Sequence, residues 1–191
     1  MLAGKLPAES GETREFLSDC RRARGHARGA AWWAAPGLQA VAVYRLGSWA
    51  LRQPALVRIL ADPLYAVLGI LMKVLWGIEI SRHAEIGPGL YIGHFGGITV
   101  SRHAVIGANC ALSQQVTIGL AGTGDRFGAP TIGDDVYIAP GARLFGAIRV
   151  GNNVKVGANA VIHDDIPDNA VVALDPGFRI LSYRGNRRDA A

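Results

Sequence analysis

Residues 131–162 read TIGDDVYIAPGARLFGAIRVGNNVKVGANAVI, and a branched aliphatic residue recurs at every sixth position of this stretch. An α-helix repeats every 3.6 residues and a β-strand every two, so neither accounts for a sustained repeat of six. An ordinary antiparallel β-protein would show a two-residue alternation instead. The repeat is typical of a parallel β-helix, in which three short strands make one coil and successive coils stack. The expected inward positions are Ile132, Ile138, Leu144, Val150, Val156 and Ile162.

The same repeat extends upstream, with a single shift of two residues. Before the shift it includes Ile80, Ile86, Ile92 and Ile98, and after the shift Val100, Ile106, Leu112 and Ile118. Gly, Asn and Asp between the apolar positions suit tight corners, because these residues tolerate a positive φ angle. We therefore expect a mainly β fold, with a β-helix of about five coils over residues 77–174.

Residues 1–76 are expected to form an α-helical N-terminal region. Apolar residues at helical spacing run through 38–49, and a second stripe runs through 60–75 after Pro54. The Asp62-Pro63 pair resembles a helix cap followed by a first-turn proline, which predicts a break between two helices. The stripes predict packing between helices and against the β-helix. Contact with a membrane surface through this tryptophan-containing region is the less favoured alternative.

The composition argues against several classes of function. The chain has 191 residues and a net charge of +5, and its basic residues are mostly scattered. They are not interleaved with aromatic residues as in nucleic-acid-binding modules, so nucleic acid is not an expected partner, and an anionic cofactor would explain the positive charge equally well. The uncharged run from Gly29 to Tyr44 has 16 residues and contains Pro36, too short and broken to span a membrane. Two cysteines make neither a disulfide framework nor a metal cluster, which favours a cytoplasmic location.

The repeat is interrupted between Ile118 and Ile132, which lie 14 residues apart, two more than two repeats. The residues in between, 120–130, predict a protruding loop, and loops on rigid scaffolds often carry function. His94 falls at a corner, and Glu79 lies 15 residues earlier, nearly one coil away. A carboxylate beside an imidazole fixes its orientation, as a general base requires. The alternative interpretation is a surface histidine and a surface glutamate on adjacent coils.

His83 and His103 occur in two copies of Ser-Arg-His-Ala, one coil apart, which favours solvated corner positions. A metal-dependent hydration enzyme would need histidine ligands that are grouped on one face. His83, His94 and His103 are separated by 11 and 9 residues, which is wrong for such a site. We therefore expect no metal.

Several motifs together resemble the left-handed β-helix acyltransferases, and specifically the serine acetyltransferase group. The similarity covers roughly residues 38 to 180, and the segment around His94 with the loop that follows is its most specific part. The residues that carry it are Gly77–Ile80, Ile86–Ile98, Gln115–Gly119, Gly122–Arg126 and Ala158–Val161, together with Val43–Trp49 in the helical region.

The resemblance implies a homotrimer, or a dimer of trimers, with acetyl-CoA in the groove between neighbouring solenoids. His94 matches the family's catalytic base, and Glu79 stands where the family has the aspartate that orients it. Lys155 and the arginines near the C-terminus are expected to pair with the phosphates of CoA. The alternative is that they are solvated surface charges. The positions that match acetyl-CoA contacts are Gly119, Gly122, Thr123, Gly124, Ala139, Gly141, Lys155 and Ala158.

Two positions depart from the family pattern. The family has an aspartate before the catalytic histidine, where this chain has Gly93, and a histidine after the Asp-Arg of the loop, where it has Phe127. We expect Gly93, Asp125, Arg126 and Phe127 to lie at the acceptor. The resemblance thus implies a serine O-acetyltransferase, with a sugar or natural-product hydroxyl as the alternative acceptor. A trimeric scaffold without enzymatic activity is the remaining alternative.

Overall fold

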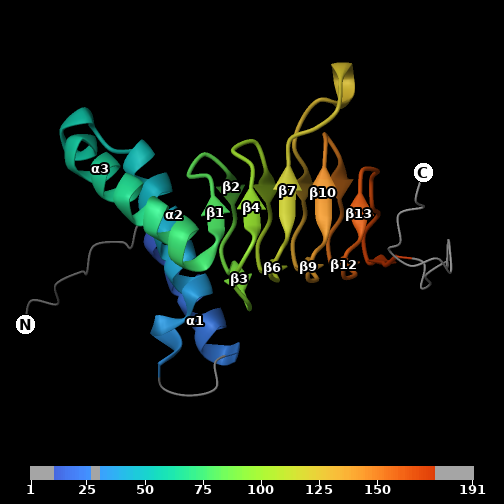
Figure 1. Ribbon diagram of the computed structural model, residues 1–191, viewed down its shortest axis with the longest axis horizontal. Coiled ribbons are helices and arrows are strands. Elements are labelled where there is room, and N and C mark those ends of the chain that lie inside the picture. The colour runs from blue at the N-terminus through green and yellow to red at the C-terminus, as the bar shows by residue number, and fades with distance from the viewer. Residues whose placement is uncertain (1–10, 27–30, 175–191) are drawn as a thin grey trace, which may run out of the picture.

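The computed structural model describes residues 11–26 and 31–174, and it consists of a helical region followed by a three-sided solenoid (Figure 1). The helical elements are α1 (Gly11–His26), the short helix η1 (Trp32–Ala34), α2 (Pro36–Leu51) and α3 (Ala55–Leu71), which continues into the π-helical turn η2 (Met72–Trp76). The first strand begins at Ile78. The expected C-terminal tail, 175–191, lies outside the described residues.

Three parallel sheets form the sides of the solenoid. Sheet 1 contains β1 (Ile78–Ile80), β4 (Ile98–Val100), β7 (Thr117–Gly119), β10 (Arg143–Phe145) and β13 (Val161–Ile162). Sheet 2 contains β2 (Glu85–Ile86), β5 (Val105–Ile106), β8 (Thr131–Ile132) and β11 (Arg149–Val150). Sheet 3 contains β3 (Tyr91–Ile92), β6 (Ala111–Leu112), β9 (Tyr137–Ile138), β12 (Lys155–Val156) and β14 (Val171–Val172).

The strand register confirms the parallel β-helix predicted from the six-residue repeat. Val161 pairs with Arg143, which lies 18 positions earlier, so three six-residue steps make one coil. Every inward residue of the long repeat is buried, and Ile138, Leu144 and Val156 have no exposed surface. The core is therefore a column of branched aliphatic side chains, and stacking of the coils buries what a single coil would leave exposed.

Two coils are longer than 18 residues. Glu79 pairs with Thr99, 20 positions later, because the corner between β3 and β4 contains two extra residues. Thr117 pairs with Arg143, 26 positions later, so the interruption adds eight residues to one regular coil. The eight extra residues form the protruding loop that the sequence predicted, which includes the short turn η3 (Gly124–Arg126).

Helices α1 and α2 are fastened to the first coil by a buried arginine. The Arg45 guanidinium donates to Asp19 (2.9 Å) and Glu15 (2.8 Å) of α1, and to the carbonyl oxygens of Ile86 (2.7 Å) and Gly87 (2.6 Å). Asp19 is fully buried and also accepts from the backbone N–H of Leu90, at 2.8 Å. Because a buried charge is tolerated only when it is paired and hydrogen-bonded, this network fixes both helices on the solenoid.

The predicted break at Asp62-Pro63 is wrong, because Pro63 lies inside the continuous helix α3. A proline in a helix removes one hydrogen bond, and here contacts in the neighbouring turn hold the helix together. Asp62 does not cap a helix; it accepts from Arg82 at 2.6 Å. The Tyr65 ring lies against Gly47 of α2, where a Cβ atom would overlap it.

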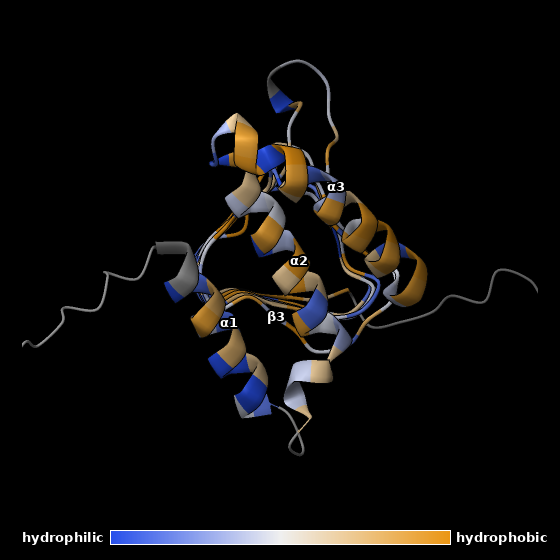
Figure 2. Cartoon of the chain, turned by 90° about the vertical axis from the view of Figure 1, so that its left-hand side faces the viewer, coloured by the Kyte–Doolittle hydropathy of each residue, from blue (hydrophilic) through white to orange (hydrophobic). Residues whose placement is uncertain are grey.

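The expected burial of the second apolar stripe is also wrong for most of its length, because Ala61 is the one buried residue of α3. The combined helix Ala55–Trp76 has 22 residues and includes an 18-residue window with a mean hydropathy of 1.8, so it is long and apolar enough to cross a membrane by length and composition. Uncharged runs alone did not predict this candidate, because Arg58, Asp62 and Lys73 interrupt the apolar stretch. Figure 2 shows α3 at the periphery of the molecule, with hydrophobic residues along it.

Candidate active site

The corner that carries His94 bulges outward. Ile92 pairs with Leu112 and Val100 pairs with Ile118, so this corner has two residues more than the corner stacked on it. The additional residues allow His94 to lie exposed at the edge between sheets 3 and 1. Gly97 has a φ of +67°, a left-handed conformation that favours glycine, and a Cβ atom there would lie 3.3 Å from Cγ of Gln115.

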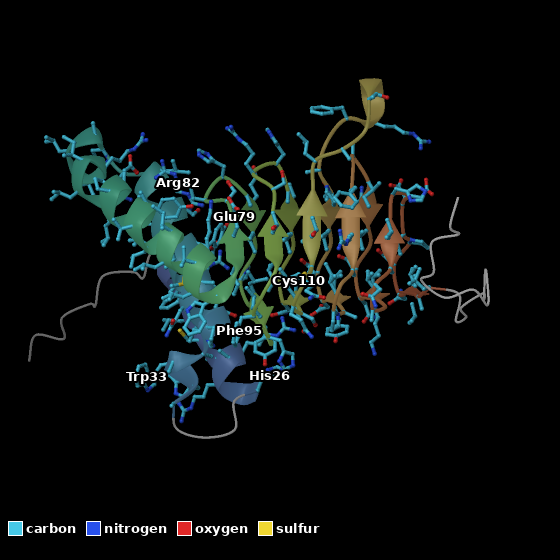
Figure 3. The ribbon with its side chains drawn as sticks, in the orientation of Figure 1. His26, Trp33, Glu79, Arg82, Phe95 and Cys110 are labelled. Carbon is cyan, nitrogen blue, oxygen red and sulfur yellow. The ribbon has the colours of Figure 1, made fainter. Side chains whose placement is uncertain are left out.

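Glu79 lies in the middle of β1, half-exposed on the outer face of sheet 1. Its carboxylate pairs with Nζ of Lys73, from the turn η2, at 2.5 Å. Figure 3 shows Glu79 beside β1, and Phe95, the neighbour of His94, on the lower side of the solenoid. Within the described ranges no hydrogen bond or ion pair joins Glu79 to His94. The role of Glu79 in orienting His94 therefore stays a prediction.

Small residues occur along the same edge beyond the intervening corner, which carries Ser113, Gln114 and Gln115. The corner 139–142 follows β9 and the corner 157–160 follows β12, and these strands lie in register with β3, which precedes His94. This places Ala139, Gly141 and Ala158 on the edge that carries His94. Gly141 (φ +74°) has no room for a side chain, because a Cβ atom would overlap the Asn159 amide. Lys155 is exposed on β12, beside this edge. The row forms a track along which a thin ligand could lie against the backbone.

The protruding loop leaves the solenoid after Gly119, at the edge between sheets 1 and 2 (Figure 1). Two hydrogen bonds of 3.0 Å between the backbones of Ala121 and Gly128 close its base. Gly122 (φ +96°) and Gly124 (φ +56°) allow its tight turn, and Thr123 precedes that turn. Along the remainder of the loop, Arg126 and Phe127 are exposed, and the side chain of Asp125 lies outside the described part.

The predicted site residues therefore lie on two edges of one protomer. His94 and the small-residue track occupy one edge of sheet 1, and the loop residues Gly119 to Phe127 occupy the other edge. Sheet 1 separates them, so a single protomer does not bring His94 and Phe127 together. The predicted acetyl-CoA and acceptor positions can form one site only if a second chain contributes one of the two edges.

Two pockets were not predicted from the sequence. One, of about 520 Å³, lies beside the base of the loop and is lined by Gly122, Phe145, His163 and Asp164, among others. His163 and Asp164 directly follow Ile162, the last inward residue of the repeat. This position at a coil corner was the one feature of the sequence that could have indicated them. The other pocket, of about 180 Å³, lies beside Gly93.

The pocket beside Gly93 is lined by residues of α1, α2 and the first coil. Because these residues lie far apart in the sequence, no local pattern could indicate the pocket. The His26 ring stacks on the Tyr91 ring with centroids 4.2 Å apart. A Cβ atom at position 93 would lie 3.2 Å from Cε1 of Tyr91. On the other side of His94, the rings of Trp76 and Phe95 make an edge-to-face contact at 5.2 Å. The sequence neighbours of His94 thus lie beside aromatic rings, Gly93 beside Tyr91 and Phe95 beside Trp76.

The other histidines of the repeat show no ligand geometry. Burial, and then the nearby guanidinium groups of Arg102, Arg82 and Arg58, lower the pKa of His83 below its usual value. Over residues 11–26 and 31–174, no three His, Cys, Asp or Glu side chains are grouped so that they could hold a metal ion.

Comparisons with known proteins agree with this geometry. Residues 129–164 match the family model described as bacterial transferase hexapeptide (six repeats). A serine acetyltransferase of Synechococcus elongatus is 34% identical over 158 residues, which are 81% of this chain and 60% of that protein. One of Mycobacterium tuberculosis is 34% identical over 142 residues, 74% of this chain and 59% of the relative. This chain therefore spans about 60% of the length of these curated relatives.

Solved structures give the same result. Serine acetyltransferase isoform 3 of Entamoeba histolytica, in complex with cysteine, superposes with a TM-score of 0.73 and 25% identity, over 90% of this chain and 61% of that one. A serine acetyltransferase in complex with CoA has a TM-score of 0.68 and 27% identity, over 87% of this chain and 68% of that one. These likenesses confirm the resemblance seen in the motifs. Over residues 129–164 the chain matches the hexapeptide transferase model, and over most of its length it is similar to the serine acetyltransferases in sequence and in fold.

Proposed function

We propose that this protein is an acetyl-CoA-dependent O-acetyltransferase that moves an acetyl group to the hydroxyl of a small molecule, with serine as the first acceptor to test. The observation that carries the proposal is the track of small residues on the solenoid edge that also carries His94. A narrow track beside an exposed imidazole suits a long, thin thioester whose reactive end reaches a base. The similarity to relatives named serine acetyltransferase, one of them solved with CoA, supports the choice of co-substrate and acceptor.

In this mechanism the neutral imidazole of His94 removes the proton from the acceptor hydroxyl while its oxygen attacks the thioester carbonyl. The tetrahedral intermediate then collapses, the C–S bond breaks, and the imidazolium returns the proton to the leaving CoA sulfur. Backbone N–H groups near Gly119 and Gly122–Gly124 would stabilise the negative oxygen of the intermediate. Glu79 would hold the imidazolium once its carboxylate turns from Lys73.

We also propose that the working protein is a homotrimer, alone or as a dimer of trimers. The separation of the His94 edge from the loop edge supports this, because packing of neighbouring copies can bring one chain's loop to the next chain's His94. Light scattering after size-exclusion chromatography is expected to give three, or six, times the chain mass of 20.2 kDa. A monomer that turns over acetyl-CoA would contradict the shared site.

The acceptor pocket is where this chain differs from the family pattern. The Tyr91 ring lies close to Gly93, and Phe127 occupies the loop position at which the family has a histidine. If these changes weaken serine binding, the double variant Gly93→Asp with Phe127→His should raise serine turnover. No gain would show that the acceptor is held elsewhere. The same two departures from the family pattern leave a sugar hydroxyl as the second candidate acceptor.

The direct test of the base is His94→Ala, assayed by release of free CoA thiol. Loss of a general base is expected to lower the rate about 10²–10⁴-fold. Glu85→Ala is the control, since Glu85 is exposed on β2 of sheet 2, away from the His94 corner and the loop, and it should leave the rate within about twofold. A His94→Ala rate within a few-fold of wild type would contradict the proposal.

A further inference from the structure

The outer side of α3 and η2 is apolar over its whole length. We define the α3 outer face as Leu56, Ile59, Leu60, Val67, Ile70 and Val74, whose side chains are between 57% and 82% exposed. These residues recur at steps of three, four or seven, so they share one side of the helix. The helix of 22 residues is roughly 33 Å long, which makes the face a long stripe and not an isolated patch.

The charged residues of this helix lie in one line beside the apolar stripe. Asp62 pairs with Arg82 at 2.6 Å and with Arg58 at 3.6 Å, and Lys73 pairs with Glu79 of the first coil. Arg58 and Lys73 keep about half of their side-chain surface exposed, at 42% and 52%. Two cations therefore flank the stripe, in a chain whose net charge is +5.

The composition of the face distinguishes a lipid from a protein as its occupant. Protein interfaces are enriched in aromatic residues, Met and Arg at their centre. In this helix Met72 and Trp76 pack against the solenoid core, and Tyr65 lies against α2. The outer face holds only Leu, Ile and Val, and hydrocarbon chains accept such side chains without requiring hydrogen bonds.

The contacts on the inner side determine the orientation. Arg82 ion-pairs with Asp62 and also lies over the Tyr65 ring, 5.0 Å from its centroid. A helix that spanned the bilayer would have to leave these partners and bury Arg58, Asp62 and Lys73 in hydrocarbon. A helix that lies in the plane of the interface keeps all of them and buries only its apolar side.

We propose that the α3 outer face docks this protein onto the surface of an anionic lipid bilayer, with α3 parallel to the membrane plane. Apolar side chains enter the boundary between head groups and acyl chains, and the flanking cations meet the head groups. The catalytic proposal does not depend on this contact, and the first coil with His94 is the part of the solenoid nearest to the docked helix.

The test is flotation of the full-length protein with vesicles of phosphatidylcholine and phosphatidylglycerol at 3:1. Wild-type protein is expected to float with the vesicles. The double variant Leu60→Glu with Val67→Glu should bind at least 10-fold less, because it places two carboxylates in the apolar layer. The matched control is Val171→Glu with Leu174→Glu, which changes two equally exposed apolar residues at the far end of the solenoid, and it should bind within twofold of wild type.

Wild-type protein that stays at the bottom of the gradient would overturn the proposal. A changed molar mass of Leu60→Glu with Val67→Glu in lipid-free buffer would also overturn it, because the face would then belong to a second copy. Thiol release from acetyl-CoA, measured on the same samples without lipid, is expected to be equal in all three proteins. A failure of docking is thereby distinguished from a failure of the catalytic proposal.

Discussion

Replacement of Arg45 by Met should detach the N-terminal helices from the solenoid. Arg45 is 8% exposed and holds Asp19, Glu15 and two backbone carbonyl groups of the first coil. Methionine retains much of the apolar stem but leaves the fully buried Asp19 carboxylate with the Leu90 N–H as its remaining strong partner. Breaking a buried pair in this way costs about 3–5 kcal/mol. That is a large part of a typical unfolding free energy of about 5–15 kcal/mol.

The cost should depend on pH in a definite direction. Burial already raises the pKa of Asp19, while Arg45 lowers it, so the variant should raise this pKa further. A carboxyl group whose pKa is higher in the folded than in the unfolded protein loses stability as pH rises through that interval. The loss of unfolding free energy in Arg45→Met should therefore be larger at pH 8 than at pH 5, where Asp19 can be neutral.

Urea unfolding followed by tryptophan fluorescence at both pH values measures this effect. Arg143→Met is the control, because Arg143 is exposed on β10 and should change the unfolding free energy by less than about 0.5 kcal/mol. A loss below about 1 kcal/mol at both pH values, or a larger loss at pH 5, would refute the role assigned to the Asp19–Arg45 pair.

Three further predictions concern the solenoid, the loop and the thiols. Leu144→Ala should lower the unfolding free energy by about 2–5 kcal/mol, because Leu144 is fully buried. Val161→Ala, at an exposed position, should have little effect, and equal urea midpoints for the two variants would contradict the inward register. Gly122→Ala should raise the KM for acetyl-CoA about 10-fold without a large change of Tm, because a Cβ atom would overlap the Arg126 carbonyl group and reshape the loop. An unchanged KM would show that the loop does not contribute to acetyl-CoA binding. Burial raises the pKa of the Cys110 thiol to about 11, so at most one of the two cysteines should react with Ellman's reagent at pH 8 before urea is added, and two fast thiols would contradict this burial.

The solenoid could be predicted from the sequence because its signal is local. Each six-residue step carries its own inward aliphatic residue, and the shift of two residues at Ile98 and Val100 already marked the bulged corner. The size of the loop insertion was less clear. The interval from Ile118 to Ile132 contains one regular step and eight added residues, and only pairing with the next coil separates the two.

The helical region was harder to predict, because its contacts join residues far apart in the sequence. Arg45 lies within an apolar stripe, yet its main partner Asp19 is 26 positions away and Gly87 is 42 positions away. Pro63 was expected to begin a helix, but tertiary contacts of its neighbours outweigh the lost hydrogen bond. Periodicity shows that α3 has an apolar side but cannot show whether that side is covered.

The candidate site was predicted residue by residue, and its division between two edges was not. Spacing suggested that His94 and Glu79 could meet, whereas Lys73 takes the Glu79 carboxylate, since the turn η2 brings its ammonium group to β1. A repeat pattern gives the position of a residue along a coil, but the protruding loop and the His94 corner lie on edges that only the folded coil defines.

The most direct test of the central claim is acetyl-CoA consumption, followed by release of free thiol, with L-serine, L-homoserine, sugars and nucleotide sugars supplied one at a time. The account predicts thiol release that requires one of these hydroxyl acceptors, with L-serine the first expected, together with an O-acetylated product identified by mass. Folded protein that releases no thiol with any of these acceptors would contradict it.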